Sequence, residues 1–207
     1  RTSMNWISRL LIYVIMKIRQ YYYSSMAFSY LLWRWMRTGG SSLSIKQRIL
    51  PRKIVDNYIH NFITLPSGIK LHYVEAGDED APLMIMIHGY PEFWYTWRYQ
   101  INHFKQRYRV IAIDQRGYGD SSKPQNIADY HINILAKDVD DLIHALGYES
   151  SIVMGHDWGG AVAWKHSLAY PQSVQSLIIL NAPHPAAFSH LLRNNKQQLS
   201  HSWYEIY

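Results

Sequence analysis

The stretch that decides the fold is Gly155-His156-Asp157-Trp158-Gly159-Gly160. It follows a short apolar run at Ser151–Met154 and opens a segment of helical character at Gly159–Ala169. Glycines on both sides of the central residue permit a sharp strand-to-helix turn without steric clash. Such a turn lifts the central side chain clear of the sheet and places it at a helix N-terminus, where backbone N–H groups favour negative charge. The sequence therefore predicts a nucleophile elbow centred on Asp157.

The aspartate at the centre of this turn indicates the kind of bond that is attacked. A serine attacking an sp3 carbon would give an ether, which water could not reverse. A carboxylate attacking the same carbon gives an ester, which an activated water can hydrolyse. Asp157 is therefore expected to be a nucleophile toward an alkyl electrophile, such as an epoxide or a haloalkane. An isolated Asp between glycines is more often a turn or a helix cap, but here strand, turn and helix agree.

The rest of the body alternates between strand-like and helix-like segments. A hairpin of Tyr58–Thr64 and Ile69–Glu75 is expected first, around a turn at Pro66-Ser67-Gly68. Further strands are expected at Leu83–Ile87, Arg109–Ile113, Ser151–Met154 and Ser176–Asn181, and helices at Trp94–Gln106, His131–Leu146 and Gly159–Ala169. This order predicts an α/β fold with a mostly parallel sheet and helices on both faces. Sites in such sheets lie beyond the carboxyl ends of the strands.

Two loops follow predicted strands and complete the expected site. The loop His88-Gly89-Tyr90-Pro91 comes after Leu83–Ile87, where this arrangement supplies one N–H of an oxyanion hole. The backbones of Tyr90 and Trp158 are the expected donors. The supporting residues of the two motifs are His88, Gly89, Pro91, Gly155, His156 and Gly159, and neither histidine is expected to be the general base. The loop from Asp114 to Ser122 is interpreted as scaffold.

Charge is unevenly distributed along the 207 residues. Residues 1–55 contain ten Lys and Arg and no acid, whereas residues 56–207 contain eleven basic residues and all fifteen acids. A basic, aromatic and apolar leader favours a membrane surface. Residues 1–40 are therefore predicted to be a single N-terminal membrane anchor, at the endoplasmic reticulum, followed by a linker at 41–57. The attachment would be a signal anchor or a helix lying in the membrane plane. An amphipathic helix packed on the body or on a partner and a cleaved signal peptide are the alternatives.

Composition excludes several classes of function. The chain has no Cys, which excludes disulfides, a Cys nucleophile and thiolate metal sites. The basic residues of the leader are diluted by aliphatic ones, so nucleic acid is not an expected partner.

From about residue 58 to residue 207 the sequence resembles the epoxide hydrolases of the α/β-hydrolase fold. It looks most like the animal membrane-anchored subgroup that includes epoxide hydrolases 3 and 4. The resemblance rests on four motifs: His88-Gly89-Tyr90-Pro91-Glu92-Phe93-Trp94-Tyr95-Thr96-Trp97-Arg98-Tyr99-Gln100, Arg116-Gly117-Tyr118-Gly119, Gly155-His156-Asp157-Trp158-Gly159-Gly160 and Asn181-Ala182-Pro183-His184-Pro185. It implies a hydrolase core at 58–184 and the start of a cap domain at 185–207.

The resemblance also implies a two-step conversion of a lipophilic epoxide and water to a vicinal diol. Asp157 would open the ring by attack on carbon, while cap tyrosines donate to the ring oxygen. A histidine oriented by an acid would then activate water to hydrolyse the Asp157 ester. Neither a metal nor a cofactor is implied. The roles carried over to this sequence are those of Asp157 and of the Tyr90 and Trp158 backbones.

The sequence departs from the family pattern by ending before the rest of the cap, the acid and the histidine. The chain is therefore expected to be truncated at its C-terminus and inactive by itself, and Tyr204 and Tyr207 receive no role. A haloalkane or haloacid dehalogenase of the same fold is one alternative, although such relatives tend to carry Asn in the place of Tyr90 or Arg in the place of Trp158. A non-catalytic, membrane-tethered remnant is the other.

Overall fold

The computed structural model describes residues 6–37 and 58–202 of the 207-residue chain. They belong to two compact units, Arg1–Arg52 and Lys53–Tyr207. The first unit contains the helix α1 (Trp6–Arg37), and the second contains the sheet and the other helices. The predicted linker at 41–57 and the last five residues lie outside the described residues.

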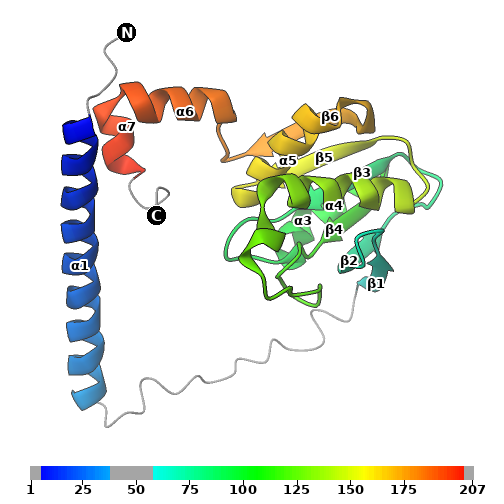
Figure 1. Ribbon diagram of the computed structural model, residues 1–207. Helices are drawn as coiled ribbons and strands as arrows, with labels where there is room; N and C mark the ends of the chain where they lie inside the picture. Colours follow the sequence, from blue (N-terminus) through cyan, green and yellow to red (C-terminus); the bar gives the residue numbers. More distant parts are fainter. Residues whose placement is uncertain (1–5, 38–57, 203–207) are drawn as a thin grey trace. The chain divides into compact units, whose positions relative to one another are not determined.

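The described part of the second unit is built on a six-stranded sheet in the order β1-β2-β4-β3-β5-β6 (Figure 1). The strands are β1 (Ile59–Thr64), β2 (Lys70–Ala76), β3 (Leu83–Ile87), β4 (Arg109–Ile113), β5 (Ser151–His156) and β6 (Val174–Leu180). β2 pairs antiparallel with β1 and with β4, and the other pairings are parallel. The prediction of an α/β fold with a mostly parallel sheet that opens with a hairpin is confirmed.

The register of the parallel strands positions the site. Ile87, the last residue of β3, lies opposite Ile113 of β4 and Gly155 of β5. The loops after these three strands therefore leave the sheet as neighbours, at its carboxyl edge. All five residues of β3 are buried, because β3 has a parallel strand on each side and is covered on both faces.

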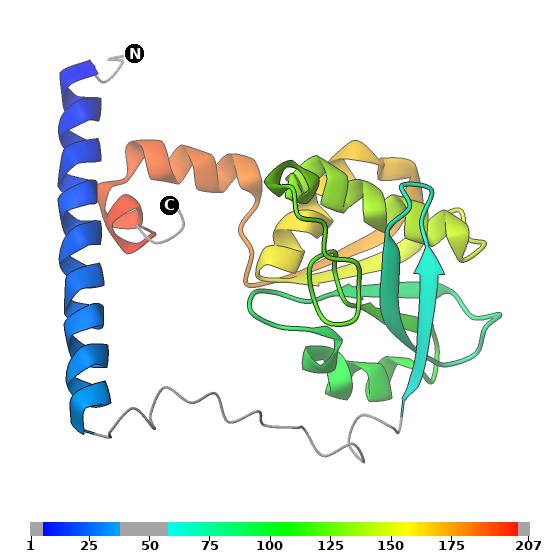
Figure 2. The same ribbon diagram turned by 60° about the horizontal axis from the view of Figure 1, so that its bottom comes forward.

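Helical elements cover both faces of the sheet (Figure 2). The helical elements of this unit are η2 (Trp94–Trp97), α3 (Arg98–Phe104), η3 (Ile127–Tyr130), α4 (Ile132–Ala145), α5 (Trp158–Ala169), η4 (Pro171–Ser173), α6 (Pro185–Asn194) and α7 (Lys196–His201), where η marks a 3₁₀ helix. α4 and α5 cover one face and η2 and α3 the other, whereas α6 and α7 lead away from the sheet. Ile85 and Ile87 of β3 pack in a core with α4 and α5, whereas Met84 and Met86 pack in a second core with η2 and α3. Successive side chains of a strand point to opposite faces, so β3 contributes to both cores.

The helix predicted at Trp94–Gln106 is divided in the structure. Trp94–Trp97 forms a 3₁₀ helix, and the α-helix starts only at Arg98. Trp94 and Trp97 are both buried, and residues three apart lie on the same side of a 3₁₀ helix. Burial of the two indole rings against the sheet therefore accounts for the tighter first turn.

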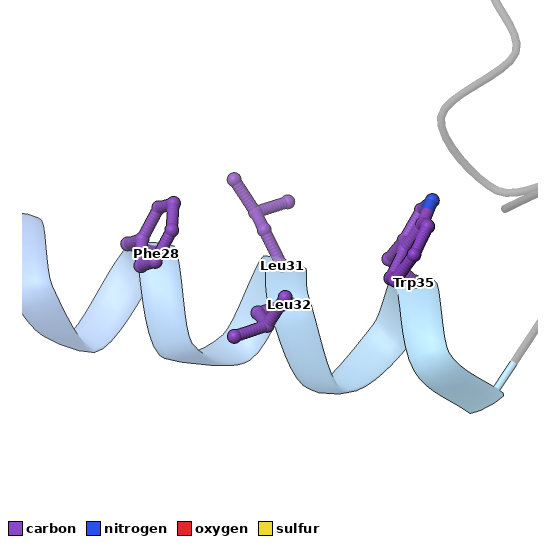
Figure 3. A pocket seen from close by; sticks show the side chains of 4 residues that line it. All are labelled: Phe28, Leu31, Leu32 and Trp35. Atoms are coloured by element: carbon purple, nitrogen blue, oxygen red, sulfur yellow. The ribbon is translucent and has the colours of Figure 1, made fainter.

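The helix α1 is continuous over 32 residues and rich in aromatic and basic side chains. Phe28, Leu31, Leu32 and Trp35, which are spaced as neighbours on one helical face, line an apolar hollow (Figure 3). No helix in the described ranges is both long and apolar enough to cross a bilayer. Basic residues within α1 keep its apolar runs short. The prediction of a single N-terminal membrane anchor, with placement at the endoplasmic reticulum, is therefore wrong.

The chain after β6 begins with contacts to α5. Trp164 Nε1 donates to the Ala182 carbonyl at 3.3 Å, and the Trp164 ring meets the His184 ring edge-on at 4.8 Å. His184 then caps α6 by accepting from the Ala186 N–H. The helix α6 thus starts from a segment that is fixed on the core. The predicted boundary between core and cap, at residues 184 and 185, stays a prediction.

His166, a buried residue of α5 that faces Asp140 of α4, should make the stability of the fold depend on pH. His166 is fully buried, its Nε2 is hydrogen-bonded to Ser173 Oγ at 3.1 Å, and its Nδ1 has no partner among the described residues. Burial lowers the pKa of His166 to about 4, while Asp140 partly opposes this effect and His144 adds to it. A proton on Nδ1 would be a buried charge without an acceptor.

We expect acid to destabilise the fold through His166. Above pH 6.5 the ring is neutral in the folded and the unfolded chain alike. Between pH 6.5 and about 4 the unfolded chain binds a proton that the folded chain does not, so the free energy of unfolding falls, by about 3 kcal/mol once the pH is below 4. Urea unfolding from pH 8 to pH 4 measures this loss.

His166→Gln should flatten the profile between pH 4 and pH 6.5, whereas His103→Gln, at an exposed position of α3, should leave it unchanged. A His166 variant with the wild-type acid profile would contradict the assignment.

Candidate active site

The turn between β5 and α5 holds Asp157 in a backbone conformation that few side chains adopt. Its φ is 54° and its ψ is −124°, a region in which residues other than glycine are strained. The Asp157 N–H donates to the Leu180 carbonyl of β6 at 3.0 Å, which fixes the turn on the sheet. Asp157 is half-buried at the N-terminus of α5, where the helix dipole stabilises a carboxylate.

The glycines of this turn are required by close backbone packing. A Cβ on Gly155 would lie 2.5 Å from the Gly159 carbonyl oxygen, and a Cβ on Gly159 would collide with the carbonyl oxygens of Ile87 and His88. Backbone atoms cannot move aside as the end of a flexible side chain can. The Asp157 turn and the loop after β3 are therefore in direct contact.

The loop after β3 brings a backbone donor to the Asp157 carboxylate. The Tyr90 N–H donates to Asp157 Oδ1 at 3.0 Å, and this is the one hydrogen bond that the carboxylate makes with a described residue. Gly89 permits the approach, because a Cβ there would lie 2.6 Å from Asp157 Cβ and 2.9 Å from Oδ1. Pro91 follows Tyr90 through a cis peptide bond. Trp158, the second predicted donor, is the first residue of α5, and its role stays a prediction.

His88 supports the loop after β3 by hydrogen bonds from a neutral, buried ring. It is fully buried, with Nδ1 at 2.8 Å from the Gly89 carbonyl oxygen and Nε2 at 3.1 Å from the Gln115 backbone nitrogen. A carbonyl only accepts and a backbone N–H only donates, so the proton must sit on Nδ1 and Nε2 must be an acceptor. Burial also lowers the pKa of His88. Both ring nitrogens are thus engaged, and neither can take a proton from water.

Glu92 connects the loop after β3 with the turn after β5. This role was not predicted from the sequence. Glu92 Oε2 accepts from the Gly89 N–H at 3.0 Å and lies 3.2 Å from Nδ1 of His156, the residue before Asp157. One carboxylate oxygen thus joins both sides of the site. A carboxylate three residues after Gly89, at the start of a predicted helix, could have indicated such a bond to a loop N–H.

The loop after β4 was predicted to be scaffold only, yet it contributes Tyr118. The Tyr118 ring meets the His88 ring edge-on at 4.8 Å. Burial raises the pKa of Tyr118, and its electrostatic interactions with Tyr90 and with Asp157 raise it further, so its hydroxyl stays protonated near Asp157. Its hydroxyl donates to no described residue. The signal in the sequence was positional, because this loop follows a strand that pairs with β3.

Gln115, in the same loop, was also missed. Its side-chain amide donates to the His88 carbonyl at 2.7 Å, and its backbone N–H donates to His88 Nε2. The loop after β4 therefore holds the loop after β3 at two points.

The residues on either side of Asp157 include exposed aromatic side chains. The side chains of Tyr90 and Trp158 are 64% and 57% exposed, so large apolar surfaces are available next to Asp157. Within residues 6–37 and 58–202, no group of three or more His, Asp or Glu side chains is placed to hold a metal ion. The expectation of neither metal nor cofactor stays a prediction.

Comparison with known sequences agrees with this geometry. A family model for the alpha/beta hydrolase fold matches residues 82–207. Epoxide hydrolase 1 of Caenorhabditis elegans is 40% identical over 194 residues, which are 94% of this chain and 48% of that protein. Epoxide hydrolase 4 of Homo sapiens is 45% identical over 142 residues, 68% of this chain and 39% of that protein. The chain thus spans about half, or less, of the length of these relatives.

Solved structures show the same similarity. An epoxide hydrolase of Bacillus megaterium in complex with an inhibitor has a TM-score of 0.66 and 40% identity, over 70% of this chain and 50% of that one. An epoxide hydrolase from Vigna radiata has a TM-score of 0.59 and 36% identity, over 62% and 41% of the two chains. The family match covers every residue of the elbow and of the loop that faces it, and we conclude that the chain belongs to the α/β-hydrolase fold family, in which its sequence is similar to the epoxide hydrolases.

Proposed function

We propose that this chain carries the nucleophile of an epoxide hydrolase, and that Asp157 converts lipophilic epoxides to vicinal diols through a covalent hydroxyalkyl ester. One observation carries the proposal. Asp157 sits at the N-terminus of α5 but makes no cap hydrogen bond to it, whereas an aspartate that only caps a helix uses its oxygens for that purpose. Its Oδ1 instead accepts from Tyr90 across the site, which leaves Oδ2 for attack.

The first step is an attack on carbon. Asp157 Oδ2 forms a bond to one ring carbon while the bond between that carbon and the ring oxygen breaks. The electron pair moves to the ring oxygen, which takes up a proton and becomes the first hydroxyl. A hydroxyalkyl ester of Asp157 results.

The second step is ester hydrolysis. A water oxygen adds to Asp157 Cγ as a base removes its proton, and the carbonyl oxygen, Oδ1, becomes an oxyanion. The Tyr90 N–H already donates to Oδ1, and the Trp158 N–H is the second donor in our proposal. The bond between Cγ and the ester oxygen then breaks. That oxygen takes up the proton that the base removed and leaves as the second hydroxyl of the diol. Asp157 keeps one oxygen from water and releases its remaining proton, which balances the proton taken up in the first step.

Two observations support a lipophilic epoxide as the substrate class. A mutant of the Bacillus megaterium epoxide hydrolase, 39% identical to this chain, is complexed with its product (R)-3-[1]naphthyloxy-propane-1,2-diol. That product is a vicinal diol with a large aromatic group. In this chain the exposed rings of Tyr90 and Trp158 offer apolar surface next to the nucleophile.

Asp157→Asn should abolish covalent chemistry in the protein that the complete transcript encodes. The amide has the same shape and is tolerated at positive φ, but it is a poor nucleophile, so we expect turnover of styrene oxide to fall by about 10⁴-fold. Mass spectrometry of the intact protein after mixing should show the ester in the wild type and not in the variant. Asp80→Asn, an exposed carboxylate outside the site, is the matched control.

Isotope-labelled water tests whether Asp157 or water attacks the epoxide first. In one turnover in H₂¹⁸O the diol should carry no label, and Asp157 should gain it. Label in the diol from that first turnover would mean direct attack of water on the epoxide. Release of chloride from 1-chlorobutane without diol formation from epoxides would mean a dehalogenase.

The 207-residue chain by itself should give no steady-state diol production. The ester needs a base, and His88 cannot be that base because both of its ring nitrogens are engaged. His156 holds Glu92 through Nδ1, and in our proposal it supports the loop and does not activate water. The measurement is diol formation from styrene oxide by the purified chain over many equivalents of substrate. Sustained turnover would show that one of these histidines, or another in this chain, activates water.

Gly89→Ala should impair catalysis more than it impairs folding. The added Cβ would lie 2.6 Å from Asp157 Cβ, so the nucleophile must shift and lose the Tyr90 hydrogen bond, with an expected fall in kcat of about 10²-fold. Gly68→Ala is the contrast, because its Cβ meets nothing within 4 Å and only the positive φ costs stability. Normal kcat in Gly89→Ala would argue against the assigned contact.

A further inference from the structure

The tether between Gln115 and His88 is placed to act on catalysis through the oxyanion loop. The Gln115 amide donates to the His88 carbonyl at 2.7 Å, and the carbonyl belongs to the peptide that precedes Gly89. The next peptide along supplies the Tyr90 N–H, which reaches Asp157 Oδ1 at 3.0 Å. A shift of the His88 carbonyl would therefore turn the donor that faces the nucleophile.

Gln115 is itself held rigidly on both sides. The preceding residue, Asp114, accepts from the Trp94 N–H at 2.9 Å and from His72 Nδ1 at 2.8 Å. The following residue, Arg116, forms two hydrogen bonds to Asp138 of α4, at 2.8 and 2.7 Å. The side chains of these two neighbours and of Gln115 are all buried. The amide of Gln115 is thus fixed before any substrate arrives.

We infer that Gln115 is a positioning residue for the second step, hydrolysis of the Asp157 ester. This inference rests on the proposed function. During alkylation, negative charge moves from the carboxylate to the ring oxygen. The hydrogen bond from the Tyr90 N–H to Oδ1 therefore does not become stronger in the transition state of this step. During hydrolysis, Oδ1 itself becomes an oxyanion, and the aim of the Tyr90 N–H decides how well that charge is stabilised. Loss of the tether should therefore slow one step and spare the other.

Gln115→Met tests the inference, because Met has a similar length and shape but no donor. Ester hydrolysis should slow by about tenfold, which is the loss of about 1.4 kcal/mol of transition-state stabilisation, while ester formation should stay within about twofold. In steady state kcat and KM should fall together, and the covalent ester should accumulate. Mass spectrometry of the intact protein during a single turnover of styrene oxide follows both steps in the full protein.

The matched control is Gln125→Met. The Gln125 amide also donates to a backbone carbonyl, that of Lys123, but it is exposed and lies outside the site. It should leave both steps unchanged. Gln115→Asn, which keeps the amide but shortens its reach, should give a smaller loss in the same step and preserves the polarity of the loop if Gln115→Met folds poorly.

The outcomes separate the two proposals. If the wild type forms no ester, the proposed function fails. If the wild type forms the ester and the Gln115 variants hydrolyse it at the wild-type rate, the inference is overturned. It is also overturned if both steps slow equally, because a general loss of structure would do that.

Discussion

Two loops approach each other at the carboxyl edge of the sheet more closely than larger side chains would allow. Gly89 lies against Asp157, and Gly159 lies against the end of β3. This packing holds the Asp157 backbone at a strained φ and places the Tyr90 N–H on its carboxylate. The register of β3 with β5 sets the distance between the loops. Everything that the site can do depends on this contact between backbones.

Much of this arrangement could be predicted because it depends on patterns between residues that are close in the sequence. Apolar runs located the strands to within a few residues, and the glycines around Asp157 indicated the elbow. Glu92, Gln115 and Tyr118 were missed because their roles arise from contacts across the sheet edge. Nothing in the sequence near Gln115 shows that its amide will meet the His88 carbonyl, 27 residues away.

The leader shows where a pattern can mislead. Its aromatic and basic residues favoured a membrane anchor, but these residue types do not indicate how long the apolar runs are. The basic residues of α1 interrupt the apolar runs, and a membrane span requires about 20 apolar residues in succession. The prediction used the amino-acid composition of the leader, whereas the length of its uninterrupted apolar runs decides whether a helix can span a membrane.

Buried ionisable groups are held in fixed states throughout the support of the site. Burial lowers the pKa of His88, and its two partners fix which ring nitrogen carries the proton. Burial alone would raise the pKa of Asp114, but hydrogen bonds from His72 and from the Trp94 N–H outweigh it and lower that pKa. Arg116 and Asp138 compensate each other's charge. Buried polar groups with satisfied hydrogen bonds make the residues that support the site loops rigid. A rigid support keeps the backbone N–H donors of these loops in a fixed orientation.

The hydrogen bond from the Asp157 N–H to the Leu180 carbonyl has a consequence for the order of folding. The turn that strains Asp157 is anchored by β6, which is the edge strand of the described sheet and follows Asp157 in the chain. A nascent chain that has emerged only as far as α5 lacks this acceptor. Asp157 can therefore reach the backbone conformation seen here only after the next strand has left the ribosome and paired with β5.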